Sequence, residues 1–419
     1  MFMDVVNFIM DAGTIVFMPL IILILGLVFG LKFGKSFQAG ITVGFGFAGT
    51  YLILDLLSDT LMTVINSLVE IYGFKLNVID VGWPIAASIA WSGGVIVPIV
   101  LVAVFLLNIL LIIVKWTKTL DIDIWNYWGA LFLGSAIFLA TNNVILAVAA
   151  PCIAMFFLLK FSDMGQPYIE KFMGVPGVTS CNMETMCWIL IGVPLNKLID
   201  KIPVINKIDW SPEVIQKRLG VLGEPYIIGL ILGAVLAMAA KTDANTILTT
   251  SIMTGACIYL LPKMIGVLME GLLPISNAAA AFLQKRFKNR QIHIGLDAAI
   301  LVGHPTIVAT VLLLIPTTLL LAVILPGNTV LPLAELSGIG FFVVWSVVPS
   351  NGNVFRGWLI GSVFMAVILL VASNFAPAMT DLGVAVGFEF PEGAAQVSCL
   401  TIGGEWISFI LYKLSMLFA

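Results

Sequence analysis

Ten long apolar runs are the feature that most limits how this chain can fold. Each run approaches the length of about 20 apolar residues that a helix needs to cross a bilayer. The runs cover residues 14–31, 39–57, 94–114, 126–141, 144–160, 226–240, 246–262, 306–325, 336–349 and 357–374. The sequence therefore predicts an all-α polytopic membrane protein.

Composition agrees with this class and argues against several others. Of the 419 residues, 60% are hydrophobic and 10% are charged, whereas a soluble domain carries about 45–50% apolar and about 25% charged residues. A soluble enzyme and a disordered chain therefore do not fit. The net charge of −3 is too small to provide the basic surface that nucleic acid requires. The five cysteines show no CxxC spacing, so we expect no disulfide, no metal site and no cofactor.

Four further stretches have patterns of their own. Residues 58–77 and 275–292 carry apolar and polar residues at helical spacing, which predicts interfacial amphipathic helices. Residues 174–200 and 391–418 are apolar but interrupted by Gly, Ser and Pro. Broken segments are tolerated in a membrane only where protein buries them or where they line a cavity. We predict two re-entrant hairpins, each followed by a short helix.

Similar motifs recur in the same order in the two halves of the chain. VTSCN at 178–182 is followed by Trp188, and QVSCL at 396–400 is followed by Trp406, with the same spacing from serine to tryptophan. Self-similar halves are typical of transporters, whose sites lie at the interface between the repeats. We predict a first repeat at 1–200, a linker at 201–220 and a second repeat at 221–419.

Charge placement predicts how the halves are oriented. If each half has five spans, an odd number, the second half must be inverted relative to the first. With the N-terminus outside, 17 of the 20 basic residues fall inside, Lys75 and Lys241 fall outside, and Lys413 is undecided. The opposite threading would violate the positive-inside rule almost everywhere. We therefore expect the N-terminus outside and the linker in the cytoplasm.

Ionisable groups within apolar stretches are costly and are functional candidates by default. Asp297 and His304 of IGLDAAILVGHP are seven residues apart, about two turns of a helix, so both could face one cavity. A carboxylate and an imidazole there could bind a polyol hydroxyl and take its proton. The alternative is that Asp297 caps a helix and His304 is a core histidine.

Other polar residues occupy corresponding places in the two halves. Asp80 and Trp83 of VIDVGWP could bind and stack on a sugar, or could be an N-cap and an interfacial aromatic. Asparagines at breaks in the apolar runs could bind hydroxyls or satisfy broken-helix backbone. The hairpins add small polar residues, whose alternative role is packing and capping. These further candidates are Asn142, Asn143, Asn351, Asn353, Thr179, Ser180 and Ser398.

The motifs IDVGWP, DIDIWN, GLDAAILVGH, LPGNTVLP and GIGFF…NGNVFR, in this order, resemble the membrane IIC component of the galactitol family of the bacterial phosphoenolpyruvate-dependent sugar phosphotransferase system. The resemblance covers nearly the whole chain. It implies an inner-membrane permease for galactitol or a related hexitol or pentitol. It also implies that a separate IIB protein, charged by IIA, phosphorylates the sugar at the cytoplasmic face, since no IIA or IIB domain is fused here.

Kinship with ascorbate-type IIC proteins implies a homodimer in membrane lipid and an elevator mechanism. The static scaffold would comprise spans 14–57 and 226–262, and the mobile core residues 80–200 and 295–419. Asp297 or His304 would hold the hydroxyl that receives the phosphoryl group. A basic face would dock IIB, formed by Lys285, Arg286, Lys288 and Arg290.

Two other function classes are alternatives to a phosphorylation-coupled permease. Inverted halves and membrane carboxylates alone would equally support an ion-coupled secondary transporter of a small polar solute. An intramembrane enzyme or scaffold lacks a credible nucleophile–base pair or metal cluster. Uptake in sealed vesicles separates the two transporter classes, because group translocation needs the phosphorelay and delivers phosphorylated product.

Overall fold

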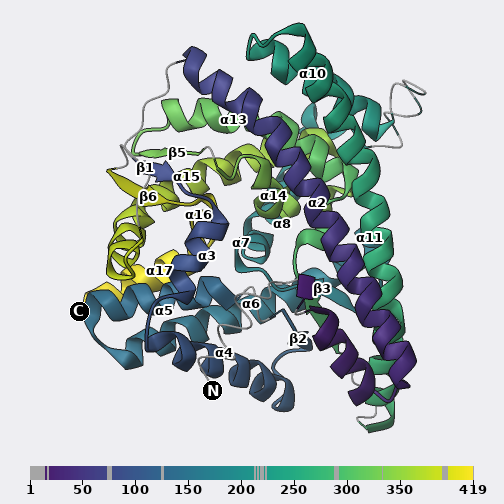
Figure 1. Ribbon diagram of the computed structural model, residues 1–419, viewed down its shortest axis with the longest axis vertical. Helices are drawn as coiled ribbons and strands as arrows, with labels where there is room; N and C mark the ends of the chain where they lie inside the picture. Colours follow the sequence, from purple (N-terminus) through teal and green to yellow (C-terminus); the bar gives the residue numbers. More distant parts are fainter. Residues whose placement is uncertain are drawn as a thin grey trace.

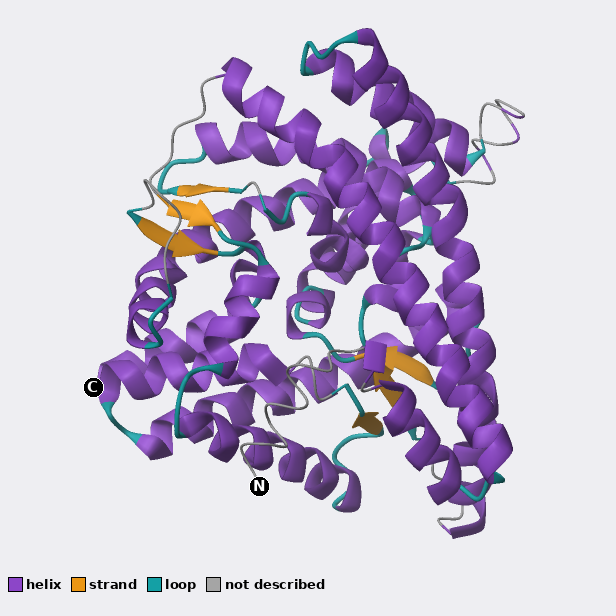
Figure 2. Ribbon diagram, in the orientation of Figure 1, coloured by secondary structure: helices purple, strands orange, loops and turns teal. Residues whose placement is uncertain are grey.

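The computed structural model describes residues 15–16, 18–72, 78–123, 127–211, 214, 217, 221, 224–286, 292–332, 334–388 and 395–418. Helices dominate this part of the chain (Figures 1 and 2). Those long and apolar enough to cross a membrane cover Phe33–Leu61, Ile96–Ile113, Val144–Met173, Pro305–Ile324 and Val354–Ala385. The expectation of a multi-pass helical membrane protein is thereby supported.

Two long helices run side by side along one edge of the molecule (Figure 1). They are α2 (Phe33–Tyr72, 40 residues) and α11 (Ala244–Arg286, 43 residues). At about 1.5 Å per residue, α2 is about 60 Å long, twice the hydrocarbon thickness of a bilayer. The predicted division between a span and an interfacial helix is therefore absent in both places. A change from an apolar to an amphipathic pattern does not interrupt the helical backbone.

Glycines allow α2 and α11 to approach closely. A Cβ on Gly46 of α2 would lie 2.5 Å from Leu268 Cα, and one on Gly271 of α11 would lie 2.8 Å from the carbonyl oxygen of Ala39. Small residues at helix crossings provide van der Waals contact where lipid removes the hydrophobic driving force. α10 (Pro225–Ala239) packs on α11 and also on α13 of the second half.

The remaining elements repeat one order in both halves: strand, helices, strand, two helices, strand, short helix, helix. The first set is β1 (Val78–Asp80), α3 (Trp83–Trp91), α4 (Ile96–Ile113), β2 (Thr119–Asp121), α5 (Trp128–Thr141), α6 (Val144–Met173), β3 (Val178–Ser180), α7 (Met183–Met186) and α8 (Ile189–Ile199). The second set is β4 (His293–Leu296), α12 (Ala299–Val302), α13 (Pro305–Ile324), β5 (Val330–Leu331), α14 (Gly340–Val347), α15 (Val354–Ala385), β6 (Gln396–Ser398), α16 (Leu400–Gly404) and α17 (Trp406–Ser415). Short 3-10 helices cover Ile205–Lys207 (η2), Ser337–Ile339 (η4), Val348–Ser350 (η5) and Met416–Phe418 (η6).

Six short strands form two small parallel sheets, which the sequence analysis did not predict (Figure 2). Their order is β5-β1-β6 and β2-β4-β3, so each central strand is flanked by two strands of the other half. Strands of two to four residues are too short to show an alternating pattern. The exchange of strands ties the two halves into one core.

Both predicted hairpins have the same observed form. A short strand leads into a short helix and then a longer one, β3–α7–α8 in the first half and β6–α16–α17 in the second. Trp188, at the start of α8, is fully buried and stacks on Phe364 of α15 with ring centroids 4.4 Å apart. All residues of the short helices α7 and α16 are buried as well. The broken parts of both hairpins are therefore enclosed by protein, which is the condition for broken backbone within a membrane.

Candidate functional site

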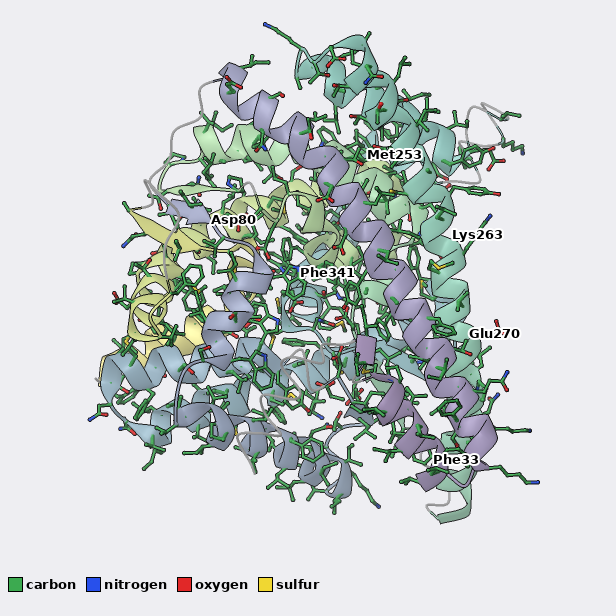
Figure 3. All side chains as sticks on the ribbon, in the orientation of Figure 1. Phe33, Asp80, Met253, Lys263, Glu270 and Phe341 are labelled. Carbon is green, nitrogen blue, oxygen red and sulfur yellow. The ribbon has the colours of Figure 1, made fainter. Side chains whose placement is uncertain are left out.

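The tips of the two hairpins touch near the middle of the molecule. The thiol of Cys187, just after α7, donates to the carbonyl oxygen of Gly404 at the end of α16 (3.2 Å). The hydroxyl of Thr185 donates to the carbonyl oxygen of Phe341 in α14 (2.7 Å), and Phe341 lies centrally in Figure 3. Two broken segments that are far apart in the sequence thus form one buried contact.

Asp80 ends β1 and connects it to the second hairpin. The side chain is 3% exposed, and Oδ1 accepts from the backbone N–H of Gly82 (3.1 Å) while Oδ2 accepts from that of Glu335 (2.9 Å). The Glu335 carboxylate in turn accepts from the N–H (2.7 Å) and the hydroxyl (2.6 Å) of Thr401 in α16. Ser398 pairs in register with Asp80, and its hydroxyl donates to the carbonyl oxygen of Ala372 (2.8 Å).

Asp297 occupies the corresponding place after β4 and is 4% exposed. Oδ1 accepts from the N–H of Ala299 (2.6 Å), in the same turn that Asp80 forms with Gly82. Oδ2 accepts from the hydroxyl of Tyr51 (3.5 Å), which lies on α2. Beside it, Oδ1 of Asn182 accepts from the N–H of Ala298 (2.7 Å) and joins the first hairpin to β4.

Thr179 and Ser180 of β3 lie next to the strand that leads to Asp297, and both are fully buried. The Thr179 hydroxyl donates to the carbonyl oxygen of Ser162 (2.9 Å), and that of Ser180 donates to Oδ1 of Asn182 (3.3 Å). These bonds correspond to the packing and capping alternative. They hold the first tip in place beside Asp297.

Two glutamates at the tips add buried carboxyl groups. Glu184 of α7 is 8% exposed and accepts from Nδ2 of Asn182 (3.2 Å). Glu405, after α16, is 3% exposed and accepts from the hydroxyl of Ser408 (2.8 Å). These donors are neutral, and across the described ranges neither glutamate forms an ion pair with a lysine or arginine. No group of three or more metal-ligating side chains occurs among the described residues.

Trp83 begins α3 and is 38% exposed, although Asp80 before it and Ala86 after it are buried. An accessible aromatic ring beside a buried carboxylate provides an apolar surface and a polar group at one place. This combination is common in sites for small polar ligands.

The four candidate asparagines lie at helix boundaries, away from the tips. Asn142 and Asn351 adopt the left-handed conformation (φ 50° and 55°) where α5 and η5 end. The side chains of Asn143 and Asn353 cap α6 and α15. The backbone-satisfying alternative is therefore observed, and the structure does not bring these residues together with Asp80 or Asp297 in one set of contacts.

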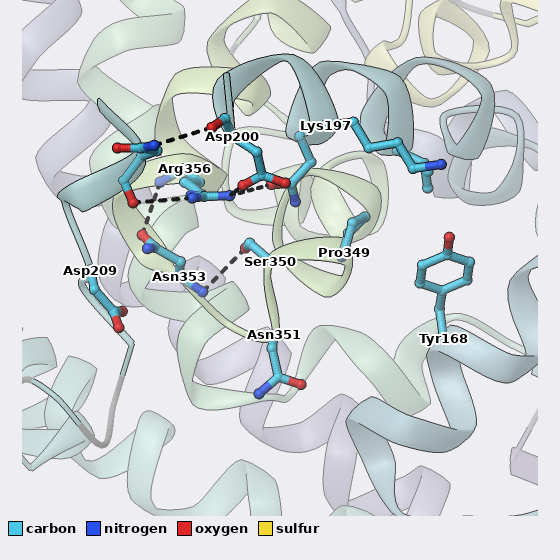
Figure 4. A pocket seen from close by; sticks show the side chains of 12 residues that line it. Tyr168, Lys197, Asp200, Asp209, Pro349, Ser350, Asn351, Asn353 and Arg356 are labelled. Carbon is cyan, nitrogen blue, oxygen red and sulfur yellow. Dashed lines mark hydrogen bonds and ion pairs between the residues drawn. The ribbon is translucent and has the colours of Figure 1, made fainter. Parts of the chain in front are cut away.

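Three of these asparagines also border a cavity. Asn142 lines one of 460 Å³ with the α3–α4 turn (92–95) and the end of α15, and we call it the neutral pocket because its lining contains no charged side chain. Asn351 and Asn353 line one of 340 Å³ with residues of α8 and the segment 206–209. We call this cavity the charged pocket (Figure 4).

The expectation that Asp297 and His304 share one helical face is wrong. Asp297 is outside helix, α12 covers only Ala299–Val302, and His304 caps the next helix, α13. Pro305 is favourable at the first helical position and unfavourable further inside, so α13 begins there. Nδ1 of His304 lies 2.7 Å from the Thr306 hydroxyl, and the ring lies against Phe172 with centroids 4.1 Å apart.

The sequence did not predict four residues of these sites, namely Glu335, Thr401, Tyr51 and Arg356. Glu335 could have been predicted as a candidate site residue. Like Asp80, it is an acidic residue directly beside an apolar run, where an ionisable group is costly. Tyr51 and Thr401 gave no such signal. The proposed IIB-docking side chains of Lys285 and Arg286, and all of Lys288 and Arg290, lie outside the described residues.

Comparison with known proteins identifies the family. The model of the family described as "PTS system sugar-specific permease component" matches residues 8–393. A permease IIC component of Escherichia coli K12 is 36% identical over 400 residues, covering 95% of this chain and 91% of the relative. The galactitol-specific EIIC components of Escherichia coli K12 and O157:H7 are each 32% identical to this chain over 413 residues. The matched residues cover 99% of this chain and 91% of each relative. The resemblance drawn from the motifs is confirmed: the chain belongs to the galactitol-type family of phosphotransferase-system sugar permease (IIC) components, which are multi-pass proteins of the inner membrane.

Proposed function

We propose that this chain translocates galactitol or a related hexitol or pentitol across the inner membrane while a IIB partner phosphorylates it. The family supports a sugar permease, and a galactitol-specific relative aligns over 99% of the chain. The observation that carries the proposal is the contact between two broken hairpins beside buried carboxylates. A buried carboxylate can accept hydrogens from the hydroxyls of a polyol in strong, charge-assisted hydrogen bonds.

In this proposal the substrate binds beside the two tips. Asp297 accepts hydroxyl hydrogens, and Trp83 contacts the carbon chain. Asp80 positions the tips together with the strand residues Thr179, Ser180 and Ser398. Asn142, Asn351 and Asn353 line routes to the site rather than the site itself, since they border the neutral and charged pockets. Asn143 caps α6 beside Asn142.

We further propose that this chain orients the substrate and that the phosphoryl donor lies on IIB. Phosphoryl transfer depends mainly on positioning and charge stabilisation, with a base to take the hydroxyl proton. Asp297 is the first candidate for that base and His304 the second. The product carries new negative charge next to Glu184, Glu405 and Asp297, so repulsion favours its release.

The architecture we propose is two inverted repeats, with the N-terminus outside and an elevator motion of the core. The doubled element order and the exchanged strands support the repeats. The scaffold consists of spans 14–57 and 226–262, and glycine-mediated packing of α2 on α11 suits a rigid unit. This scaffold forms a homodimer, and crosslinking in native membranes that yields only monomers contradicts that part.

Uptake of labelled galactitol into sealed vesicles tests the proposed function. With IIA, IIB and phosphoenolpyruvate supplied on the cytoplasmic side, we expect label to accumulate as a phosphate ester. Omitting IIB is the matched control and should abolish accumulation. Accumulation of free galactitol under an ion gradient without the relay would instead support an ion-coupled transporter, for which the buried Glu184 and Glu405 carboxylates are suitable groups.

A further inference from the structure

The charged pocket and the neutral pocket lie at corresponding breaks in the two halves but differ in charge. The neutral pocket borders Asn142 at the end of α5, and the charged pocket borders Asn351 after η5. The lining of the neutral pocket contains no charged side chain, whereas the charged pocket is lined by two cations and two anions. If the halves are inverted, the two cavities open toward opposite sides of the membrane. An uncharged polyol suits the first, and a charged ligand suits the second.

The guanidinium of Arg356 is held in place in the charged pocket. Nη1 donates to Oδ1 of Asp200 (2.6 Å) and to Oδ1 of Asn196 (2.8 Å), and Nη2 donates to the carbonyl oxygen of Asn206 (3.4 Å). The arginine side chain is 13% exposed, while that of Asp200 is 60% exposed. Nε of Arg356 and Nδ2 of Asn196, which is 4% exposed, are buried without an acceptor in the part of the chain that the structure describes. Buried donors without acceptors are costly, so this wall favours a ligand rich in acceptor oxygens.

The charges of the charged pocket are separated across it. In Figure 4, Lys197 and Tyr168 lie on one side, and Asp209 lies on the opposite side beyond Asn353. Within the described ranges, Lys197 forms no ion pair. Ser350 and Asn351 lie between the two sides and offer hydroxyl and amide groups. One side therefore suits an anionic group, and the middle and far side suit hydroxyls.

We propose that the charged pocket binds the phosphate ester of the transported polyol as it leaves the tips. The phosphate contacts Lys197, and the hydroxyls contact Ser350, Asn351 and the opposite side, where Arg356 and Asp209 lie. A cavity of 340 Å³ is within the size range of small-molecule sites. The proposal rests on the proposed function and on a cytoplasmic location of the segment 201–211. In this proposal, carboxylates repel the phosphorylated product at the tips, and Lys197 attracts its phosphate in the charged pocket.

Calorimetric titration of the full chain in detergent with galactitol phosphate tests this proposal. We expect saturable binding that Lys197→Gln weakens about tenfold and Asn351→Ala weakens less. Lys207→Gln is the matched control, because it removes the same charge from a nearby exposed position that does not line the pocket. Free galactitol should not displace the ester from this pocket, and inorganic phosphate should displace it weakly. Arg356 is left intact because it also holds the segment after α8.

Three outcomes would overturn the proposal: no saturable binding of the ester, wild-type affinity in Lys197→Gln, or equal weakening by Lys197→Gln and Lys207→Gln. The titration contains neither IIB nor a gradient, so it is independent of the vesicle uptake test. If uptake depends on the relay but the ester does not bind, the proposed ester site is contradicted and the proposed function is not. Ester binding that depends on Lys197, without relay-dependent uptake, contradicts the proposed function and leaves a site for organic phosphates.

Discussion

Asp80 and Asp297 have the same local structure but different partners. Asp80 ends the central strand β1 and Asp297 follows the central strand β4, and each accepts from the N–H two residues later through Oδ1. Oδ2 of Asp80 accepts from the backbone N–H of Glu335, a group that can only donate. Oδ2 of Asp297 accepts from the hydroxyl of Tyr51, a group that can donate or accept.

We propose that this difference separates an aspartate that mainly positions the site from one that takes part in the reaction. The hydrogen bonds of Asp80 stay within the proposed core: they lead to Glu335 and from there to Thr401. The Asp297 network reaches α2, which belongs to the proposed scaffold. A carboxylate with an adaptable partner can exchange that partner for a substrate hydroxyl. We therefore assign the proton-accepting role to Asp297 and a mainly positioning role to Asp80.

Asp297→Asn should have the largest effect on activity. The amide oxygen can still accept from Ala299, and the amide nitrogen can donate to Tyr51, so both of these contacts can be retained. The amide cannot take a proton, and loss of a general base typically costs about 10²–10⁴-fold. We expect phosphorylation of galactitol in vesicles supplied with charged IIB to fall at least about 100-fold. An unchanged rate would remove Asp297 from the reaction.

Asp80→Asn should reduce stability instead. Its amide nitrogen would face the N–H of Glu335, leaving two donors in contact and one buried N–H without an acceptor. An unsatisfied buried donor costs about 1–3 kcal/mol. We expect a lower midpoint in thermal unfolding in detergent, with the surviving folded protein keeping most of its phosphorylation rate. A stable variant with abolished phosphorylation would reverse the two assignments.

His304→Ala should lower phosphorylation about tenfold. The two histidines of the chain, His293 and His304, both lie in the second half. The first half therefore has no histidine that corresponds to His304. Because His304 also caps α13, His304→Asn provides the control, as asparagine is a good N-cap. We expect His304→Asn to restore thermal stability but not the rate. Full recovery of phosphorylation in this variant would show that His304 acts only as a cap.

Tyr51→Phe should have the smallest effect. The bond to Asp297 is long at 3.5 Å, and a net hydrogen bond contributes about 0.5–1.5 kcal/mol. We expect a change of about threefold in the uptake rate without loss of the ability to phosphorylate. The same substitution should leave the effect of Asp80→Asn unchanged. Strong coupling between Tyr51 and Asp80 in a double-mutant cycle would contradict the separation of the two networks.

The sequence located the long helices well because apolar length is a local property. Predicted runs 94–114 and 306–325 correspond to α4 (Ile96–Ile113) and α13 (Pro305–Ile324). The equivalence of Asp80 and Asp297 was also accessible, since the motifs recur in order. Their partners were not, because Tyr51 and Asp297 are 246 residues apart and Asp80 and Glu335 are 255 apart. The short strands, the contact between the tips and the split of Asp297 from His304 likewise depend on contacts or breaks that apolar periodicity does not encode.

The position of bound galactitol decides whether the tips form the site. A cryo-electron microscopy structure of the chain in lipid nanodiscs with galactitol should show the ligand beside α7 and α16. We expect a hydroxyl within hydrogen-bonding distance of Asp297, about 2.5–3.0 Å between oxygens. A ligand lying against residues 246–262 of α11 or 39–50 of α2, away from both tips, would contradict this site.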